Sequence, residues 1–476
     1  MTRSALFTDF YELTMAQGFW KSGNRPRAVF DYFFRKQPWQ GGYSVFAGLE
    51  PLLRSLEEIS FSSEDLAWLE GLGVFDRGFL DYLASFRFHG DIWAAAEGTV
   101  VFPQEPLLRI NADLIEAQIV EGLVLNTLNF QSLIATKAAR IWKASNYGKI
   151  MEFGLRRAQG YDGSLSASRA ALIGGATTTS NALAARLLHA EVSGTMAHSW
   201  VMSFPTELES FEAYAKLYPN RTVFLIDTYD TLESGIKNAV KVGKTLAAQN
   251  KSFGVRLDSG DIDYLSREVR RVLDEAGLRD ASIVVSNELD EAIIENLQRA
   301  GAPVDGWGVG THLVTGGTES SFAGVYKLAA VERDGVFVPT MKFSDNPDKS
   351  TNPGVKQVWR LYDDEGMAEA DLVALEGEEP KAGRECHLHH PSGDWRRTTL
   401  VPSRVEALLA PVMEGGVIRA GLPNLEAIRM GLRLRLEHFD STYLRLLNPH
   451  IYKVSISTKL RDQKLVFIRK HMKDGS

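Results

Sequence analysis

"SFGVRLDSGDIDYLSREVRRVLDEAG", residues 252–277, decides the fold class of this chain. The stretch opens with a short apolar run, passes through polar residues and continues with apolar residues at helical spacing as far as Gly277. Asp261 is a residue type that caps helix N-termini, and glycine commonly follows a helix C-terminus. The stretch therefore predicts one strand followed by one helix, which is the repeating unit of a parallel sheet.

The same alternation of apolar strands and helical runs extends from about residue 148 to residue 330. Such regular alternation implies a parallel sheet with right-handed crossovers. Because about seven units occur and no GxGxxG motif follows the first strand, we expect a closed or incomplete (β/α) barrel rather than a dinucleotide-binding sheet. The predicted strands are IMEFG (150–154), LIGG (172–175), VSGTMA (192–197), TVFLID (222–227), SFGVRLD (252–258), SIVVSN (282–287) and GWGVGT (306–311).

The regions on either side of this alternation have a different character. Residues 1–140 mix helical runs with short strands, whereas residues 336–476 begin with a loop-rich, polar part and end with a helical one. A chain of 476 residues is also longer than one ordinary domain. We therefore expect an α/β protein with an irregular or incomplete barrel at residues 141–335 and a further mixed α+β part.

The composition excludes several classes of protein. A net charge of −7 and a hydrophobic fraction of 44% are typical of a soluble globular chain, and they disfavour a disordered or fibrous chain or a broad basic face for nucleic acid. The N-terminal residues lack the apolar core of a signal peptide, and no stretch has the roughly 18 uncharged apolar residues of a membrane span. We expect a cytoplasmic protein.

The single cysteine, Cys386, cannot form an internal disulfide or build a metal cage alone. Its neighbours His387, His389 and His390 have a spacing that would allow a metal site. The Pro-Ser-Gly that follows is typical of a turn, so a solvated loop is the favoured interpretation.

Polar residues gather at the predicted strand ends, which form the ligand-binding face of a barrel. Arg256 offers donors suited to phosphate oxygens, and Asp258 can accept hydrogen bonds from a ribose diol. The alternative is a simple strand-to-helix turn with a surface arginine. Gly308, Gly310 and Thr311 would leave backbone N–H groups and a hydroxyl free for a phosphate, or would form a glycine-rich hairpin.

Other strand ends allow more than one interpretation. Asp227 and Asp230 could bind Mg²⁺ or cap a helix. Phe153 could stack on a ring, and Arg156 with two nearby arginines could hold an anion or contact a partner subunit.

His198 could be a core histidine, a member of a hydrolytic triad or a group that handles phosphate. No GxSxG motif supports the triad. A barrel aldolase or decarboxylase would need a Schiff-base lysine at a strand end, for which Lys327 is the nearest candidate, although it could equally hold a phosphate.

Six motifs together carry a family resemblance. They are TDFYELTM (8–15), EFGLRRAQG (152–160), GTMAHSW (194–200), IDTYDT (226–231), RLDSGD (256–261) and GVGT (308–311). In this order the chain resembles the nicotinate phosphoribosyltransferases, which are type II phosphoribosyltransferases. The resemblance covers roughly residues 8–360, with a less distinctive C-terminal part.

The resemblance implies an enzyme of NAD biosynthesis (salvage). Nicotinate and 5-phosphoribosyl 1-pyrophosphate would give nicotinate mononucleotide and pyrophosphate, coupled to ATP hydrolysis through a phosphohistidine, with Mg²⁺ stabilising the leaving group. It also implies a homodimer with shared active sites, and a mixed domain in which the C-terminal part, residues 336–476, returns to the N-terminal part, residues 1–140.

The resemblance also implies roles for individual residues. His198 would be phosphorylated, Arg256 and Asp258 would hold phosphate and ribose, and a neutral Thr177 would favour nicotinate over nicotinamide. A nicotinamide phosphoribosyltransferase and a non-catalytic sugar-phosphate-binding barrel remain the alternatives. The other implied substrate contacts are Tyr11 (reaching the base in the partner subunit), Phe153, Arg156, Asn287, Gly308, Gly310 and Thr311.

Overall fold

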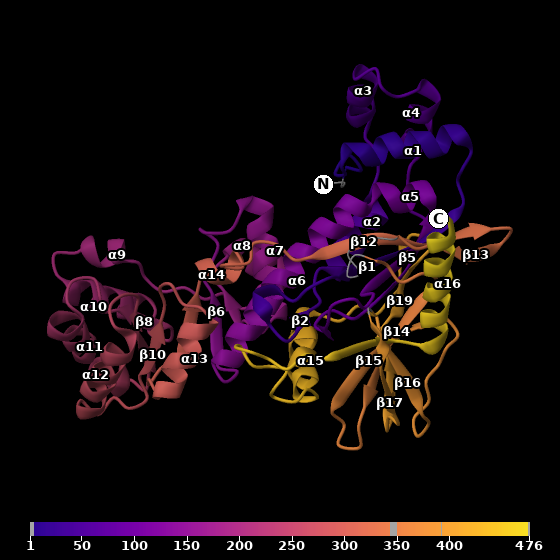
Figure 1. Cartoon of the computed structure of the whole chain (residues 1–476). Helices are drawn as coiled ribbons and strands as arrows, with labels where there is room; N and C mark the ends of the chain where they lie inside the picture. The colour runs from indigo at the N-terminus through magenta and orange to yellow at the C-terminus, as the bar shows by residue number, and fades with distance from the viewer. Residues whose placement is uncertain (1–3, 343–349, 392, 475–476) are drawn as a thin grey trace. The chain divides into compact units, whose positions relative to one another are not determined.

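The structure of this chain is a computed structural model that describes residues 4–342, 350–391 and 393–474. The chain divides into two compact units (Figure 1). Unit 1 comprises Met1–Leu133 and Ser321–Ser476, and unit 2 comprises Ile134–Ser320. Among the described residues, no helix has the length and apolar character needed to cross a membrane.

Unit 2 is built on a six-stranded sheet in which every neighbouring pair is parallel, in the order β7-β6-β11-β10-β9-β8. Because β7 and β8 are edges and do not pair with each other, the sheet is the incomplete barrel that the sequence predicts. Its strands are β6 (Lys149–Glu152), β7 (Thr178–Thr179), β8 (Thr222–Leu225), β9 (Phe253–Leu257), β10 (Ser282–Val285) and β11 (Gly306–Val309).

Helices connect these strands, and Figure 1 shows α10, α11, α12 and α13 around β8 and β10. The helix that follows β9 begins where the sequence predicts, because the Asp261 carboxylate accepts a hydrogen bond from the Tyr264 N–H at 3.1 Å. The helices are α7 (Gly160–Ile173), α8 (Ala182–Leu188), α9 (His198–Met202), α10 (Glu207–Leu217), the π-helical turn η2 (Thr231–Gly235), α11 (Ile236–Ala248), α12 (Ile262–Glu275), α13 (Glu291–Ala300) and α14 (Thr311–Val314).

Two predicted strands of unit 2 are wrong. LIGG is the end of α7 and the turn after it: a side chain at Gly174 would come within 2.3 Å of the Ala135 carbonyl oxygen. These glycines therefore allow close packing rather than ending a strand. VSGTMA forms only an isolated bridge, between Val192 and Thr179, and residues 193–197 are irregular.

Unit 1 contains sheets that join the two ends of the chain. A seven-stranded sheet has the order β13-β12-β1-β5-β3-β19-β20, a six-stranded sheet has the order β17-β16-β21-β15-β14-β18, and β2 pairs with β4. The strands are β1 (Arg27–Phe34), β2 (Ser44–Val45), β3 (Asp91–Ala94), β4 (Val100–Val101), β5 (Leu108–Asp113), β12 (Gly324–Arg333), β13 (Val336–Pro339), β14 (Lys356–Tyr362), β15 (Ala368–Leu375), β16 (Cys386–His390), β17 (Gly393–Leu400), β18 (Arg404–Ala407), β19 (Ala410–Glu414), β20 (Val417–Ile418) and β21 (Lys453–Ile456).

Capping side chains mark the starts of two helices of unit 1. Asp113 caps α5, and a capping box at Ser62 starts α3. The helices are α1 (Phe10–Ser22), η1 (Pro38–Gln40), α2 (Leu49–Glu58), α3 (Ser63–Gly71), α4 (Arg77–Ala84), α5 (Leu114–Ile119), α15 (Leu425–Glu437) and α16 (Thr458–Asp474), while α6 (Glu121–Ala144) belongs partly to each unit.

The prediction of a loop-rich segment after residue 336 is wrong for about half of the residues up to Leu400, because β13 to β17 lie there. The expected loop at Cys386 is strand β16, in which Cys386 and His389 are buried. His389 lies against the hydroxyl of Thr458 at 3.0 Å and the guanidinium of Arg461 at 3.1 Å. No group of three or more potential metal ligands occurs among the described residues.

A fully buried ion pair lies in the core of unit 1. Arg360 donates from Nε to Asp371 at 2.9 Å and from Nη2 at 2.6 Å. Tyr452 adds a hydrogen bond to the same carboxylate at 3.1 Å. Burial beside Asp371 raises the pKa of the Glu105 carboxyl well above its usual range.

Candidate active site

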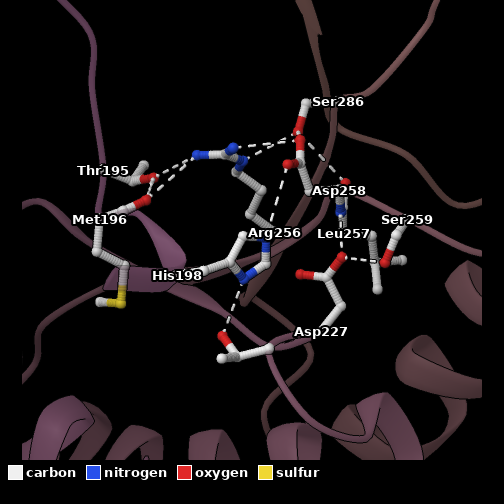
Figure 2. A network of polar contacts seen from close by, with 10 residues as sticks. Thr195, Met196, His198, Asp227, Arg256, Leu257, Asp258, Ser259 and Ser286 are labelled. Carbon is white, nitrogen blue, oxygen red and sulfur yellow. Dashed lines mark hydrogen bonds and ion pairs between the residues drawn. The ribbon is translucent and has the colours of Figure 1, made fainter. Parts of the chain in front are cut away.

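The carboxyl edge of the parallel sheet in unit 2 brings several predicted residues together, as expected for parallel strands. Arg256 lies near the end of β9 and Asp258 directly follows that strand. His198 joins them from the start of α9 (Figure 2). His198, Arg256 and Asp258, to which the family resemblance assigns roles with phosphate and ribose, therefore meet in one polar network.

Arg256 is the centre of this network: two of its nitrogens donate hydrogen bonds to protein acceptors, and the third forms an ion pair. Nε donates to the Ser286 hydroxyl at 2.9 Å, and Nη1 to the Thr195 hydroxyl at 3.0 Å and the Met196 carbonyl at 3.4 Å. Nη2 lies 3.2 Å from Oδ1 of Asp258. Figure 2 shows the side chain extended between Thr195 and Ser286. These contacts fix the plane of the guanidinium group.

Asp258 uses its two carboxylate oxygens differently. Oδ1 accepts a hydrogen bond from the Ser286 hydroxyl and forms an ion pair with Arg256, whereas Oδ2 lies 3.8 Å from Nε2 of His198. Its main-chain N–H donates to Asp227 at 3.0 Å, and the Ser259 hydroxyl donates to the same Asp227 oxygen at 2.6 Å. Asp227 therefore holds the turn after β9 in place.

His198 is the first residue of α9 and does not end a strand, because the segment before it is irregular. Nδ1 lies 3.1 Å from the Thr228 hydroxyl, and the side chain is 43% exposed. A partly exposed imidazole that is held at one nitrogen can act as a nucleophile toward a ligand. A buried core histidine is therefore excluded.

Phe153 directly follows β6 and forms one wall of the site. The Arg256 guanidinium carbon lies 5.8 Å from the centre of its ring, within range of a cation–π contact. A side chain at Gly308 would come within 2.6 Å of the ring, so this position requires glycine. Arg156 is exposed in the turn between β6 and α7.

A cavity of about 730 Å³ lies beside these residues. Phe153, Thr195 and Arg256 are the site residues that line it. The rest of the lining comes from residues 191–194, from the strands β6 to β10 and from residues just before β8, β9 and β10. Pockets of this size suit small organic ligands.

The predicted phosphate loop lies at the end of the neighbouring strand, β11. Gly310 precedes the short helix α14, and the Thr311 hydroxyl lies 3.4 Å from Glu288. Asn287 is exposed, with a φ of 105° that asparagine rarely adopts.

The remaining predicted residues have other surroundings. The Thr177 hydroxyl donates to the Ile150 carbonyl at 2.8 Å, just before β7. Asp230 caps the turn η2, where Oδ1 accepts from the N–H groups of Leu232 and Glu233 at 2.9 and 2.7 Å. By contrast, Oδ1 of Asp227 is buried and has no hydrogen-bond partner in the described part of the chain.

Tyr11 and Lys327 belong to unit 1. Tyr11 is half exposed on α1, and a hydrogen bond to Glu12 raises the pKa of its hydroxyl. Lys327 is on the antiparallel strand β12, with its ammonium 3.6 Å from Glu121. Because it does not end a barrel strand, it cannot serve as the lysine of a barrel aldolase.

The side chains of four further residues join the network, although none was among the site residues expected from the sequence: Thr195, Thr228, Ser259 and Ser286. Ser286 and Thr228 lie in the quoted stretches SIVVSN and IDTYDT. Their position at the end of a predicted strand could have indicated that they belong to the site.

Comparisons with known proteins agree with this architecture. The family model for the nicotinate phosphoribosyltransferase N-terminal domain matches residues 6–129, and that for the C-terminal domain matches residues 355–464. The chain is 39% identical over 463 residues to nicotinate phosphoribosyltransferase of Bacillus subtilis, covering 97% of this chain and 94% of that protein. It is 40% identical over 458 residues to nicotinate phosphoribosyltransferase pncB2 of Mycobacterium tuberculosis, covering 96% and 92%.

Among solved structures, the crystal structure of human nicotinic acid phosphoribosyltransferase is similar, with a TM-score of 0.85 and 30% identity over 96% of this chain and 99% of that one. Family models, relatives aligned over nearly the whole chain and the fold all agree. The chain belongs to the nicotinate phosphoribosyltransferase family.

Proposed function

We propose that this chain joins nicotinate to 5-phosphoribosyl 1-pyrophosphate, releasing pyrophosphate, and couples the reaction to ATP hydrolysis in NAD salvage. The observation that carries the proposal is the network of His198, Arg256 and Asp258 at the carboxyl edge of the sheet. An imidazole, a guanidinium group and a carboxylate lie together there, in a chain of this family. They would serve as the phosphoryl acceptor, the phosphate-binding group and the ribose-binding group.

The nicotinate ring would lie against Phe153, beside the cavity and the Arg256 guanidinium. A cation near the ring favours nicotinate, which is an anion. Thr177 carries no charge, so it would not repel the nicotinate carboxylate as an acidic residue would. Arg156 and Tyr11 would add contacts to the base, with Tyr11 supplied by the partner of a homodimer.

The phosphoribosyl donor would lie across the neighbouring strand ends. Asp258 has one carboxylate oxygen directed to the site rather than to Arg256, and it would accept from a ribose hydroxyl. The backbone at Gly310 and the Thr311 hydroxyl would hold the 5-phosphate. Asn287 follows β10, which lies between the strands that lead to Asp258 and to Gly310, and it would contact the ribose.

Asp227 fits a Mg²⁺ ligand better than Asp230, because its Oδ1 has no partner in the described residues whereas Asp230 caps a helical turn. Mg²⁺ commonly takes one or two carboxylates, substrate phosphates and water. When bound, the ion would neutralise charge on the pyrophosphate.

The chemistry needs positioning more than proton transfer. The nicotinate nitrogen attacks C1 of the ribose while the C1–O bond to pyrophosphate breaks, and pyrophosphate leaves with the electron pair. The pyridine nitrogen carries no proton, so no general base is required. Arg256 and the donors around the leaving group would supply charge stabilisation.

His198 would accept the terminal phosphoryl group of ATP, and water would later release that group as phosphate. Replacing His198 with alanine is expected to abolish ATP hydrolysis and to leave some transferase activity at high substrate concentration. The matched control is His189→Asn, which changes an exposed histidine at the C-terminal cap of α8. Unchanged ATP hydrolysis in His198→Ala would overturn the role of His198.

Product formation should be read by mass spectrometry, with nicotinate and with nicotinamide, each with and without ATP. Nicotinate mononucleotide as the main product supports the proposal. Preference for nicotinamide would indicate the amide-using reaction, and binding of the phosphoribosyl donor without turnover would indicate a sugar-phosphate-binding protein.

A further inference from the structure

Ser286 joins the two groups that the proposed reaction needs for its phosphoribosyl donor. It directly follows β10, and its side chain is buried, with 3% of the residue exposed. Its hydroxyl accepts from Nε of Arg256 at 2.9 Å and donates to Oδ1 of Asp258. Its main-chain N–H donates to the Leu257 carbonyl at 2.9 Å, which extends the pairing of β9 with β10.

This contact decides how the arginine and the aspartate pair. A guanidinium group often binds a carboxylate through two parallel hydrogen bonds, which engage both oxygens. Arg360 and Asp371 have that arrangement in unit 1. Arg256 has only Nη2 directed to Asp258, because Ser286 occupies Nε.

The second oxygen of Asp258 consequently has a different environment. Oδ1 accepts the hydrogen bond from Ser286 and pairs with the charge of Arg256, whereas Oδ2 lies 3.8 Å from Nε2 of His198. The Ser286 hydroxyl therefore lies between Nε of Arg256 and the Asp258 carboxylate, where a direct hydrogen bond from Nε would otherwise form. It keeps Oδ2 of Asp258 directed into the site.

We infer that Ser286 is a positioning residue for 5-phosphoribosyl 1-pyrophosphate, and the inference rests on the proposed function. Ser286 holds the Arg256–Asp258 pair in its one-oxygen arrangement, which leaves Oδ2 of Asp258 for a ribose hydroxyl. In Ser286→Ala, Nε of Arg256 loses its acceptor and turns toward Asp258, so that both carboxylate oxygens pair with the arginine. Affinity for the donor then falls about tenfold, as expected for one lost hydrogen bond.

Equilibrium titration of the full-length protein with the phosphoribosyl donor and Mg²⁺, without ATP, measures this effect directly. The matched control is Ser266→Ala, which removes a buried hydroxyl of α12 whose one hydrogen bond within the described residues is to the local Asp263 carbonyl. We expect Ser286→Ala to weaken donor binding about tenfold and nicotinate binding less than about twofold, and Ser266→Ala to change neither. Thermal unfolding of both variants shows whether each remains folded.

A double-mutant cycle separates positioning from a general structural effect. In an Asp258→Asn background, Ser286→Ala should add little further loss of donor affinity, because Ser286 acts through Asp258. Full additivity would overturn the inference, as would unchanged donor affinity in Ser286→Ala or equal losses for donor and nicotinate. A wild-type chain that binds no donor would overturn the proposed function and this inference with it, whereas the other outcomes concern Ser286 alone.

Discussion

Two arginine–aspartate pairs in this chain have the same chemistry and opposite surroundings. Arg360 and Asp371 are 2% and 0% exposed, and two hydrogen bonds join them. Arg256 and Asp258 are 15% and 30% exposed, and the arginine contacts one carboxylate oxygen. The first pair satisfies its charges internally and therefore serves the fold. The second leaves an oxygen directed to the site, where the proposed function would use it for a ligand.

The largest expected effect comes from breaking the buried pair. Arg360→Met leaves the Asp371 carboxylate buried without its cation, and it should lower the free energy of unfolding by about 3–5 kcal/mol. Urea unfolding followed by circular dichroism measures the loss. The matched substitution in the open pair, Arg256→Met, should cost only about 1 kcal/mol because solvent reaches that site. Similar losses in both variants would contradict the distinction between the pairs.

Asp258→Asn tests the open pair. Removing its charge should raise the KM for 5-phosphoribosyl 1-pyrophosphate about 10- to 100-fold, because a hydrogen bond to a charged acceptor is lost. The KM for nicotinate should change less than about threefold. Steady-state kinetics with each substrate varied in turn provides the measurement. Equal changes in both constants would indicate that Asp258 serves the fold, like Asp371.

The buried pair has a second carboxyl beside it, that of Glu105. We expect the stability of the buried pair's surroundings to depend on pH for this reason. Burial raises the pKa of Glu105 in the folded chain, whereas an unfolded glutamate titrates near about 4.3. The folded chain therefore keeps a proton that the unfolded chain releases, and this contribution to stability is full at low pH and falls as the pH rises through the folded pKa.

Glu105→Gln should remove that dependence. The stability of the wild type relative to the variant should fall by about 1.4 kcal/mol per pH unit above about pH 5, until the folded pKa is reached. Denaturant unfolding of both proteins at a series of pH values gives the two slopes. Parallel slopes would show that Glu105 keeps its charge in the folded state.

The smallest effect is expected at a carboxylate of unit 2 that serves the fold. Asp230→Ala removes the cap of the turn η2 and should cost about 1 kcal/mol of stability. It should leave the Mg²⁺ dependence of turnover unchanged, whereas Asp227→Asn should shift that dependence to higher Mg²⁺. A Mg²⁺ titration of initial rates compares the two variants, and a shift in Asp230→Ala alone would reverse the assignment.

Much of unit 2 could be predicted because a strand–helix repeat leaves a periodic pattern. The strands at Phe253–Leu257 and Ser282–Val285 show it clearly. β7 has two residues, too few for any pattern, and the glycines near 174 resembled a strand end although they serve close packing. In unit 1, β14 to β17 were missed because their polar surroundings resembled loops.

The charged residues of the site could be predicted because parallel strands end at one edge. Arg256 and Asp258 are conspicuous in a sequence for this reason. Ser286 and Thr228 could not be recognised in this way, because their hydrogen-bond partners depend on strand register and on the path of the segment before α9. Serine and threonine are also common at turns, so their presence there carries little information.

The way unit 1 takes strands from both ends of the chain has a consequence for synthesis on the ribosome. β1 pairs with β12, whose residues follow the whole of unit 2 in the sequence. At roughly 10 residues per second, β1 would wait on the order of 20–30 s for that partner. Unit 2 can fold within this interval, whereas the edge of β1 remains open to other pairings. The nascent chain is therefore most exposed to misassembly while residues 134–320 are being made.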